Sequence, residues 1–416
     1  MPNRQALRFL GRACVAMMLA AGCFLAGCTP RANQEGDQRA LAWSEIVSRA
    51  RGQTVYFFMW RGDPAINHYV DTWVASEARR QFGIELKAVD GQGNALVNAL
   101  LVEKQSGVRQ GSMDLMWING ETFAQLRSAD LLYHGWGSKL PNASLVRWSS
   151  PFIARDFGQK VDGDESPWGN VQMAILYDSV RVSAPPRTYA ELATWVHAHP
   201  GRFTYDRGFT GLTFLKGVLG EMAGGYDLLA AGYDSTRYQQ ASAKLWKWLD
   251  GIRPDLWRHG ESYPASVGEL HRLFANGEVD FSMSNNDAEV DNKVLNGALP
   301  PTTKSFIFDS GTIQNSHYVG IPRNAPHKAA AMVVADLLLS PEAQYEKLKP
   351  AVWADGTVLD VSRLSPEWRA RFEAVPARIR ALPRATLDAH ALPELAPQYM
   401  MRLAEDWRIH ELHPVR

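Results

Sequence analysis

The chain has 416 residues, of which 46% are hydrophobic and 21% are charged, a composition that suits a globular protein with two sizeable cores. Lysine plus arginine and aspartate plus glutamate each number 44, so the overall charge gives no indication of nucleic-acid binding. We therefore expect two lobes and no nucleic-acid partner.

The N-terminus has the layout of a secretory signal. Three arginines precede an apolar run at 13–26, which is too short to span a membrane comfortably. The run ends in Leu25-Ala26-Gly27-Cys28, which resembles the lipobox of bacterial lipoproteins, where cleavage precedes a cysteine that receives lipid. We expect residues 1–27 to be the signal peptide, Cys28 to be the lipidation site and residues 28–45 to be a flexible tether. The alternatives are cleavage before Cys23, a plain signal peptide and an uncleaved anchor.

The cysteines restrict the chemistry of the body. All three of them, Cys14, Cys23 and Cys28, lie in the leader region. The remaining sequence therefore offers no cysteine for a disulfide, a metal site or a nucleophile.

The next segment alternates between strand and helix patterns. Strands are predicted at 54–59, 84–89 and 114–118, and helices from Pro64, over 94–105 and after Asn119. Strand, polar loop and helix thus recur three times, which is typical of a parallel sheet covered by helices.

The pattern breaks around 166–169, where we expect a crossover between lobes. Thr188 and Glu191 have the spacing of a capping box. Further strands are predicted at 171–177, 201–205, 279–283, 306–308 and 317–321, and further helices at 214–221, 241–249, 271–275, 329–339, from Pro341, 366–375 and 393–402.

Four polar loops follow predicted strands, and loops at the carboxyl ends of parallel strands share one sheet edge. They are Trp60–Asp63, Asn119–Thr122, Asp206–Thr210 and Ser284–Asp287. Each loop by itself also fits an ordinary turn or helix cap, but their recurrence predicts a common binding crevice.

The sequence contains no serine nucleophile elbow, no phosphate-binding glycine loop and no zinc-protease helix motif, so we expect neither an enzyme nor a metal site or cofactor. A hydrolase with Asp63 and Glu121 as paired carboxylates is the catalytic alternative.

Several segments together resemble the bacterial extracellular solute-binding proteins of ABC importers, and within that family the YnjB-type group. The resemblance spans residues 53 to about 353, and its carriers are WRGDPAIN (60–67), DLMWINGE (114–121), GRFTY (201–205) with FTG (209–211), and NAPHKAAAMVVADLLLSPEAQ (324–344). The chain departs from the group at 206–208, where the group has a proline-rich gap.

The resemblance implies a type II periplasmic-binding-protein fold, in which two lobes, each a mostly parallel sheet flanked by helices, are joined by hinge strands and close on a ligand. We expect residues 46–166 and 312–352 in lobe 1 and residues 167–311 and 353–416 in lobe 2. The implied protein is a monomer in the periplasm that contacts the membrane only through its lipid and delivers a small solute to permease and ATPase subunits. A ligand sensor or a glycan-handling lipoprotein on the same fold is the alternative.

Candidate ligand-binding residues come from the four loops and two strands. Acidic residues outnumber basic ones among them, and aromatic rings stabilise cations, which favours a cationic or thiamine-like solute. Anion binding at the helix starts Pro64 and Gly120 stays open, and iron binding lacks the expected adjacent tyrosines, for which Tyr318 is a poor substitute. We assign stacking to Trp60 and Trp168, contacts with cationic groups to Asp63, Glu121 and Asp206, neutral hydrogen bonds to Asn119, Thr210, Asn285 and Asn286, and anion contacts to Arg61 and Arg207.

Overall fold

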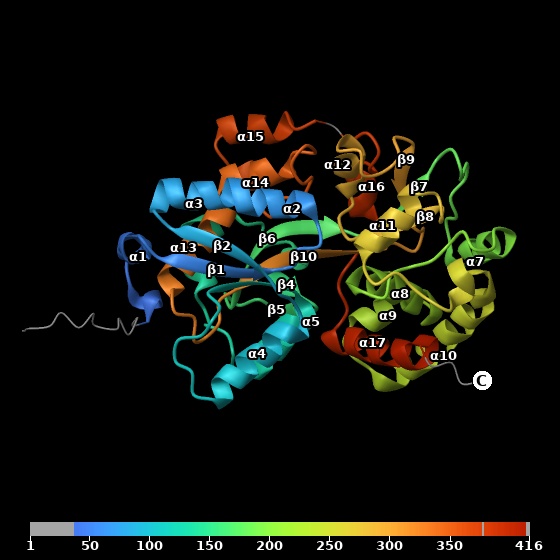
Figure 1. Ribbon diagram of the computed structural model, residues 1–416, viewed down its shortest axis with the longest axis horizontal. Coiled ribbons are helices and arrows are strands. Elements are labelled where there is room, and N and C mark those ends of the chain that lie inside the picture. Colours follow the sequence, from blue (N-terminus) through green and yellow to red (C-terminus); the bar gives the residue numbers. More distant parts are fainter. Residues whose placement is uncertain (1–36, 377, 413–416) are drawn as a thin grey trace, which may run out of the picture. The chain divides into compact units, whose positions relative to one another are not determined.

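The computed structural model describes residues 37–376 and 378–412 (Figure 1). The predicted leader, the lipidation site Cys28 and most of the tether lie outside them. The strands are β1 (Thr54–Met59), β2 (Glu85–Asp90), β3 (Leu115–Ile118), β4 (Arg155–Asp156), β5 (Gln159–Lys160), β6 (Glu165–Gln172), β7 (Ala174–Asp178), β8 (Phe281–Ser284), β9 (Thr303–Phe306), β10 (Thr312–Gly320) and β11 (Ala391–Leu392).

Helices separate most of these strands along the chain. They are α1 (Trp43–Ala50), α2 (Pro64–His68), α3 (Ala75–Phe82), α4 (Asn94–Gln105), α5 (Gly120–Ser128), α6 (Pro151–Ala154), α7 (Tyr189–Ala198), α8 (Phe209–Met222), α9 (Asp227–Ala230), α10 (Ser235–Ile252), α11 (Val267–Ala275), α12 (Glu289–Leu295), α13 (Lys328–Leu338), α14 (Pro341–Leu348), α15 (Pro366–Glu373), α16 (Arg384–Ala389) and α17 (Pro397–Leu412).

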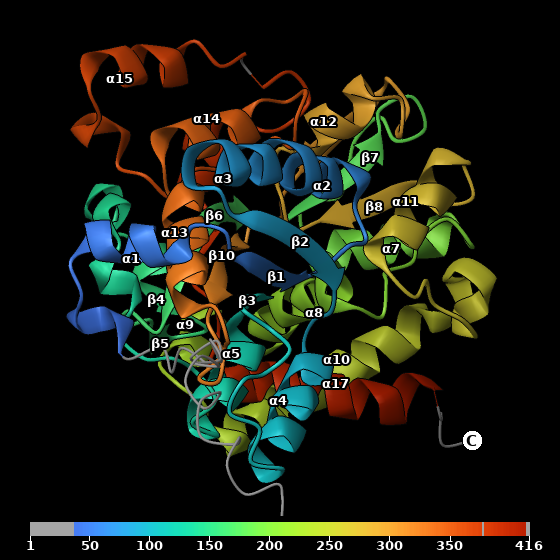
Figure 2. The same cartoon turned by 60° about the vertical axis from the view of Figure 1, so that its left-hand side comes forward.

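The first lobe is built on a six-stranded sheet in the described part of the chain. Its strand order is β11-β10-β3-β1-β2, and β6 pairs with β10. β1 is parallel to β2 and to β3, whereas β10 is antiparallel to β3 and β6. α2 and α3 lie over one side of β1 and β2, and α4 and α5 lie on the other side (Figures 1 and 2). The parallel β/α units predicted from the sequence are therefore confirmed here.

The second lobe is built on the sheet β8-β7-β9. Both pairings of β7 are antiparallel, so the parallel pattern expected for both lobes is found in the first lobe only. The predicted strand 171–177 is divided at Met173 between β6 of the first sheet and β7 of the second. The chain thus crosses from one lobe to the other at this residue.

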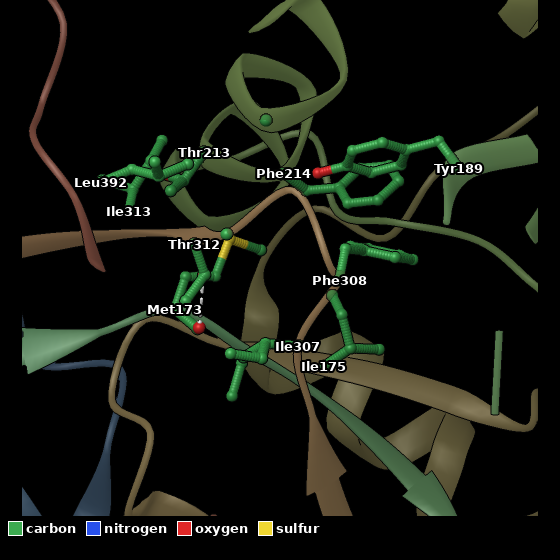
Figure 3. A pocket seen from close by; sticks show the side chains of 13 residues that line it. Met173, Ile175, Tyr189, Thr213, Phe214, Ile307, Phe308, Thr312, Ile313 and Leu392 are labelled. Atoms are coloured by element: carbon green, nitrogen blue, oxygen red, sulfur yellow. Dashed lines mark hydrogen bonds between the residues drawn. The ribbon is translucent and has the colours of Figure 1, made fainter. Parts of the chain in front are cut away.

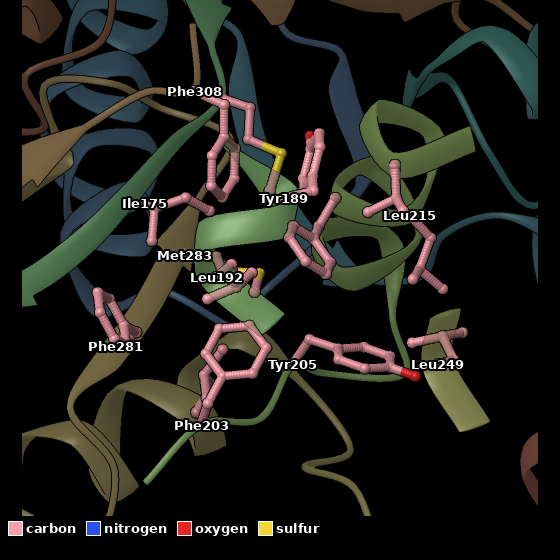
Figure 4. Packing of buried hydrophobic residues seen from close by; sticks show 14 of the residues in the cluster. Ile175, Tyr189, Leu192, Phe203, Tyr205, Leu215, Leu249, Phe281, Met283 and Phe308 are labelled. Atoms are coloured by element: carbon pink, nitrogen blue, oxygen red, sulfur yellow. The ribbon is translucent and has the colours of Figure 1, made fainter. Parts of the chain in front are cut away.

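Alternating side chains of the first sheet reach two hydrophobic clusters. Val55 and Phe57 of β1 pack with α2, α3 and α13, while Met116 and Ile118 of β3 pack with α4 and α5. In the second lobe, Tyr189, Phe203 and Phe281 belong to a single large aromatic and aliphatic core (Figure 4). Each lobe therefore has its own buried interior, as the chain length predicted.

The C-terminal segment is shared between the lobes. Val358, Leu364 and Phe372 pack in the first lobe, whereas Leu395 and Trp407 belong to the core of the second. Residues from 358 to 372, which we expected in lobe 2, therefore lie on lobe 1.

Local sequence patterns predicted the bounds of α4 and the cap of α7 correctly. α4 has the predicted bounds, and the hydroxyl of Thr188 accepts a hydrogen bond from the backbone N–H of Glu191 at 3.1 Å, which confirms the predicted cap of α7. The predicted strand 201–205 is wrong. The carbonyls of Arg202 and Phe203 bond to two separate segments, at the N–H groups of Asp280 and Trp257, so no continuous ladder forms.

Candidate functional site

The loop after β1 contains three of the predicted ligand-binding residues. Trp60 is half-buried against the core of the first lobe. The guanidinium of Arg61 makes a two-pronged ion pair with Asp71, with N–O distances of 2.6 and 2.8 Å. Asp63 is buried and caps α2, since its Oδ1 accepts hydrogen bonds from the N–H groups of Ala65 and Ile66 at 2.7 and 3.2 Å. Asp63 thus has a local structural role, and Arg61 already has a counter-ion.

The loop after β3 begins α5. Asn119 is half-buried at the N-cap position but makes no capping bond with its side chain. Glu121 makes no ion pair in the described structure, and burial raises the pKa of its carboxyl. Gly120 lies against the Phe157 ring so closely that an added Cβ would lie 1.9 Å from Cδ2 of that ring. A glycine is therefore required at the start of this helix.

The loop before α8 holds a buried acid and an exposed base. Oδ1 of Asp206 accepts a hydrogen bond from the N–H of Gly208 at 2.8 Å, but its Oδ2 is buried and has no hydrogen-bond partner among the described residues. Burial raises the pKa of Asp206 to about 6, against the opposing effect of hydrogen bonds from Gly208 and Gly211. Arg207, by contrast, is exposed. An unpaired buried carboxyl is the more distinctive of the two features.

The loop after β8 meets the first turn of α8. Nδ2 of Asn285 donates a hydrogen bond to Oγ1 of Thr210 at 3.0 Å. Oδ1 of Asn286 accepts a hydrogen bond from the N–H of Ala288 at 3.1 Å, while its Nδ2 is buried and finds no hydrogen-bond partner in the part of the chain that the structure describes. Two of the four predicted loops are thus brought together within the second lobe.

A contact between aromatic rings links the first lobe to these loops. Phe157, which packs on Gly120, has its ring centroid 6.4 Å from that of Phe209, the first residue of α8. Nζ of the fully buried Lys216 lies 4.5 Å from the centroid of Phe157 and makes an ion pair of 2.5 Å with Glu394. The loops after β3 and before α8 therefore approach each other through Phe157.

Two predicted ligand contacts are contradicted by their burial. Trp168 has no exposed surface and packs edge-to-face on Trp117 at 4.9 Å, inside the core of the first lobe. Tyr318 is also fully buried, and its hydroxyl donates to the carbonyl of Ile153 at 3.0 Å. Neither ring can stack on a solute in this structure, because neighbouring side chains cover it. Trp117 and His317 are half-buried members of this aromatic cluster.

A charge network on α11 and α12 was not predicted from the sequence. Lys293 donates to Asp63 and lies 3.5 Å from Glu289, and His271 lies 3.5 Å from the other oxygen of Glu289. Burial opposes ionisation of Glu289, but His271 and Lys293 outweigh it and hold its pKa at about 2. The sequence feature that could have indicated this network is the spacing of four residues between Glu289 and Lys293, directly after a predicted loop.

Two cavities of the described structure lie in the first lobe and near the crossover. One, of about 20 Å³, is lined by Met173, Phe214 and Thr312 among others (Figure 3). It has room for a water-sized molecule and not for a solute. A groove of about 750 Å³ on the first lobe is lined by Trp148, Arg155, Lys160 and Arg363 among others.

The described residues contain no group of three or more histidine, aspartate, glutamate or cysteine side chains placed to hold a metal ion. They also contain no helix that is both long and apolar enough to cross a membrane.

Comparison with known proteins gives concordant results. The family model of bacterial extracellular solute-binding proteins matches residues 73–376. Protein YnjB of Escherichia coli (strain K12) is 39% identical over 354 residues, which cover 84% of this chain and 90% of YnjB.

Solved structures of low identity share the fold. The spermidine/putrescine ABC transporter substrate-binding protein PotD of Streptococcus pneumoniae has a TM-score of 0.58 at 13% identity and covers 86% of this chain and 99% of its own. The periplasmic binding protein AfuA of Actinobacillus pleuropneumoniae, with fructose-6-phosphate bound, has a TM-score of 0.61 at 14% identity and covers 86% of this chain and 98% of its own. The fold is thus that of type II periplasmic binding proteins.

Proposed function

Because the chain belongs to the bacterial extracellular solute-binding family of ABC transporters, we propose that it captures a small cationic solute between its lobes by hinge closure, from a lipid anchor at Cys28, and delivers it to a permease. The family accounts for a periplasmic, solute-binding role. The charge of the solute, the closure and the anchor are our inferences.

The main support for a cationic solute is the buried carboxyl of Asp206. Its Oδ2 is buried without a hydrogen-bond partner, and no cation pairs with it in the described structure. A buried carboxylate without a partner is costly, so a cationic group bound there gains a favourable interaction that water does not supply. Glu121, in the other lobe, is a second acid that forms no ion pair among the described residues, although the charges of Arg408 and Lys216 act on it and oppose the effect of burial on its pKa.

The basic candidates are less available for an anion. Arg61 is neutralised by Asp71, and Arg207 is exposed, where water screens its charge. The charge balance at the predicted loops therefore favours a cation. The fold alone does not decide this, since similar structures include a polyamine transporter component and a complex with a sugar phosphate.

Calorimetry with the full chain tests the ligand class. We expect saturable binding of thiamine or spermidine and none of phosphate or sulfonates. Asp206→Asn should lower the affinity for the cation at least tenfold, since one charge-assisted hydrogen bond contributes about 1.5–3 kcal/mol. Asp227→Asn, at an exposed aspartate of the same lobe, is the control. Saturable binding of an anion together with no cation binding would overturn the proposal.

Hinge closure is supported by the way in which the chain crosses between the sheets. The crossing at Met173 leads directly from β6 to β7, and the return from β9 enters β10 after five residues that belong to no strand. Thr312 at the start of β10 donates a hydrogen bond to the carbonyl of Met173 at 2.6 Å, so the two crossings lie side by side (Figure 3). Adjacent short crossings allow rotation of one lobe against the other.

The lipid anchor has its own test. Cys28→Ala should release the protein from the membrane fraction or leave the leader uncut. Unchanged membrane association after removal of the leader would contradict lipidation at this residue, whatever the solute proves to be.

A second ligand class is favoured by the groove on the first lobe. Arg155, Lys160 and Arg363 line it, and none of the three forms an ion pair within the described residues. An anion that binds the full chain should therefore lose affinity in Arg363→Ala and keep it in Asp206→Asn. The reverse pattern assigns binding to the loops between the lobes.

A further inference from the structure

An ion pair between Asp63 and Lys293 joins the two lobes. Neither residue belongs to the strands in which the chain crosses from one lobe to the other. Asp63 caps α2 of the first lobe, and Lys293 belongs to α12 of the second, where the neighbouring Val290 is part of the second core. The ammonium of Lys293 donates to Oδ2 of Asp63, and both residues are buried, with 7% and 5% of their surfaces exposed. Glu289, one turn earlier on α12, has Oε1 3.5 Å from the same ammonium. Lys293 thus lies between carboxylates of both lobes.

Each member of this pair keeps a partner in its own lobe if the lobes separate. Asp63 retains the N–H groups of Ala65 and Ile66, which it contacts through Oδ1. Lys293 retains Glu289, whose other oxygen accepts the hydroxyl of Ser284. Separation therefore leaves neither charge buried and alone, which is the condition that makes the loss of a buried ion pair so destabilising.

The pair between Lys347 and Asp355 in the first lobe is a useful contrast. Both side chains are fully buried, with N–O 2.6 Å. Such a pair suits a permanent contact, because no solvent is available to either charge if the pair breaks. The pair between Lys293 and Asp63, by comparison, suits a contact that forms and breaks.

A second contact on the same turn of α12 supports this interpretation. Nδ2 of Asn292 donates to the carbonyls of Pro350 and Val352 at 2.8 and 3.3 Å, in the segment that follows α14 of the first lobe. This uncharged contact places α12 against the first lobe and brings Lys293 within reach of Asp63.

We propose that Lys293 is the closing residue of this protein: its ion pair with Asp63 forms as the lobes close and sets how long a captured solute is held. The inference rests on the proposed capture by hinge closure and does not depend on the charge of the solute. Lys293 is a positioning residue, since it acts by stabilising the closed arrangement.

Hydrogen–deuterium exchange of the full chain, without added solute, tests the contact itself. Lys293→Met and Asp63→Asn should each speed exchange in the segments 64–68 and 289–295, and the double variant should be no faster than the singles because both remove one interaction. Asparagine is as good an N-cap as aspartate, so Asp63→Asn keeps α2 while removing the charge. Lys293→Arg should restore wild-type exchange. Lys87→Met, whose ion pair with Glu85 lies within the first lobe, is the control.

Stopped-flow release of spermidine tests the consequence. We expect dissociation about tenfold faster in Lys293→Met, with the association rate unchanged, because the lost charged hydrogen bond belongs to the closed form. Additive effects of the two substitutions on exchange, or wild-type exchange in both, would overturn the proposal. If spermidine does not bind but the exchange effects are coupled, the closing contact stands and the proposed solute fails. If spermidine binds and dissociates at the wild-type rate from Lys293→Met, the closing role is wrong.

Discussion

The amide of Asn285 donates a hydrogen bond to the hydroxyl of Thr210 over 3.0 Å, and this contact connects the loop after β8 to the first turn of α8. Thr210 is buried and Asn285 is half-buried. The threonine therefore fixes the orientation of an amide that is still partly accessible to a ligand.

Replacement of Thr210 by valine should release that amide. Thr210→Val keeps the side-chain shape but removes the acceptor, so we expect a loss of about 1 kcal/mol in the free energy of unfolding and weaker spermidine binding. Thr213→Val is the matched control, since Thr213 lies on the same helix and its hydroxyl donates a hydrogen bond to the carbonyl of Phe209 at 2.9 Å. Denaturant unfolding and calorimetry on both variants provide the comparison. Equal losses of affinity would show that Asn285 is not held for ligand binding.

The two tryptophans assigned to stacking should behave differently. Trp168→Ala removes a fully buried ring and should lower the free energy of unfolding by about 3–5 kcal/mol. Trp60→Ala removes a half-buried ring and should instead weaken cation binding by about 0.5–2 kcal/mol, while the protein stays folded. Thermal melts and calorimetry separate the two effects. A collapse of the melting temperature in Trp60→Ala would make Trp60 structural.

Arg61 is expected to matter little for binding. Its ion pair with Asp71 lies near the surface, with 25% and 43% of the two side chains exposed, so the pair contributes about 0–1 kcal/mol. Arg61→Ala should therefore change spermidine affinity less than threefold and stability by under about 1 kcal/mol. A large loss of affinity for an anion in this variant would instead revive the anion hypothesis.

Local sequence patterns predicted the first lobe better than the second. The β/α alternation predicted β1 to β3 and α4, because each unit buries part of its apolar surface against helices near it in sequence, as β1 does against α2 and α3. The antiparallel pairing in the second lobe depends on strands more than 100 residues apart, Ala174 with Ser284 for example, and no local period encodes that pairing.

The candidate site was also predictable only where it depends on local sequence. The polar loops after β1, β3 and β8 follow strands as expected, since the carboxyl ends of strands are where side chains leave the sheet. The burial of Trp168 was not predictable, because Trp353, from a distant segment, packs against its ring. The role of Lys293 was missed for the same reason, since its partner Asp63 lies 230 positions away.

The last prediction concerns stability as a function of pH. Burial raises the pKa of Asp206 and of Asp336 to about 6 in the folded protein, above the reference value of 3.8. Between these values the folded state holds protons that the unfolded state has lost, so stability falls as pH rises. The stabilising contribution of each group is complete below about pH 4 and is lost above about pH 6, with a change of about 3 kcal/mol per group.

Denaturant unfolding between pH 4 and pH 8 measures this dependence. Asp206→Asn cannot ionise, so its free energy of unfolding should fall less steeply over that range than that of the wild type. The exposed Asp227→Asn should follow the wild-type curve. A steeper fall in Asp206→Asn than in the wild type would mean that the carboxyl is ionised and stabilised in the folded protein, which would also remove the main support for a cation at Asp206.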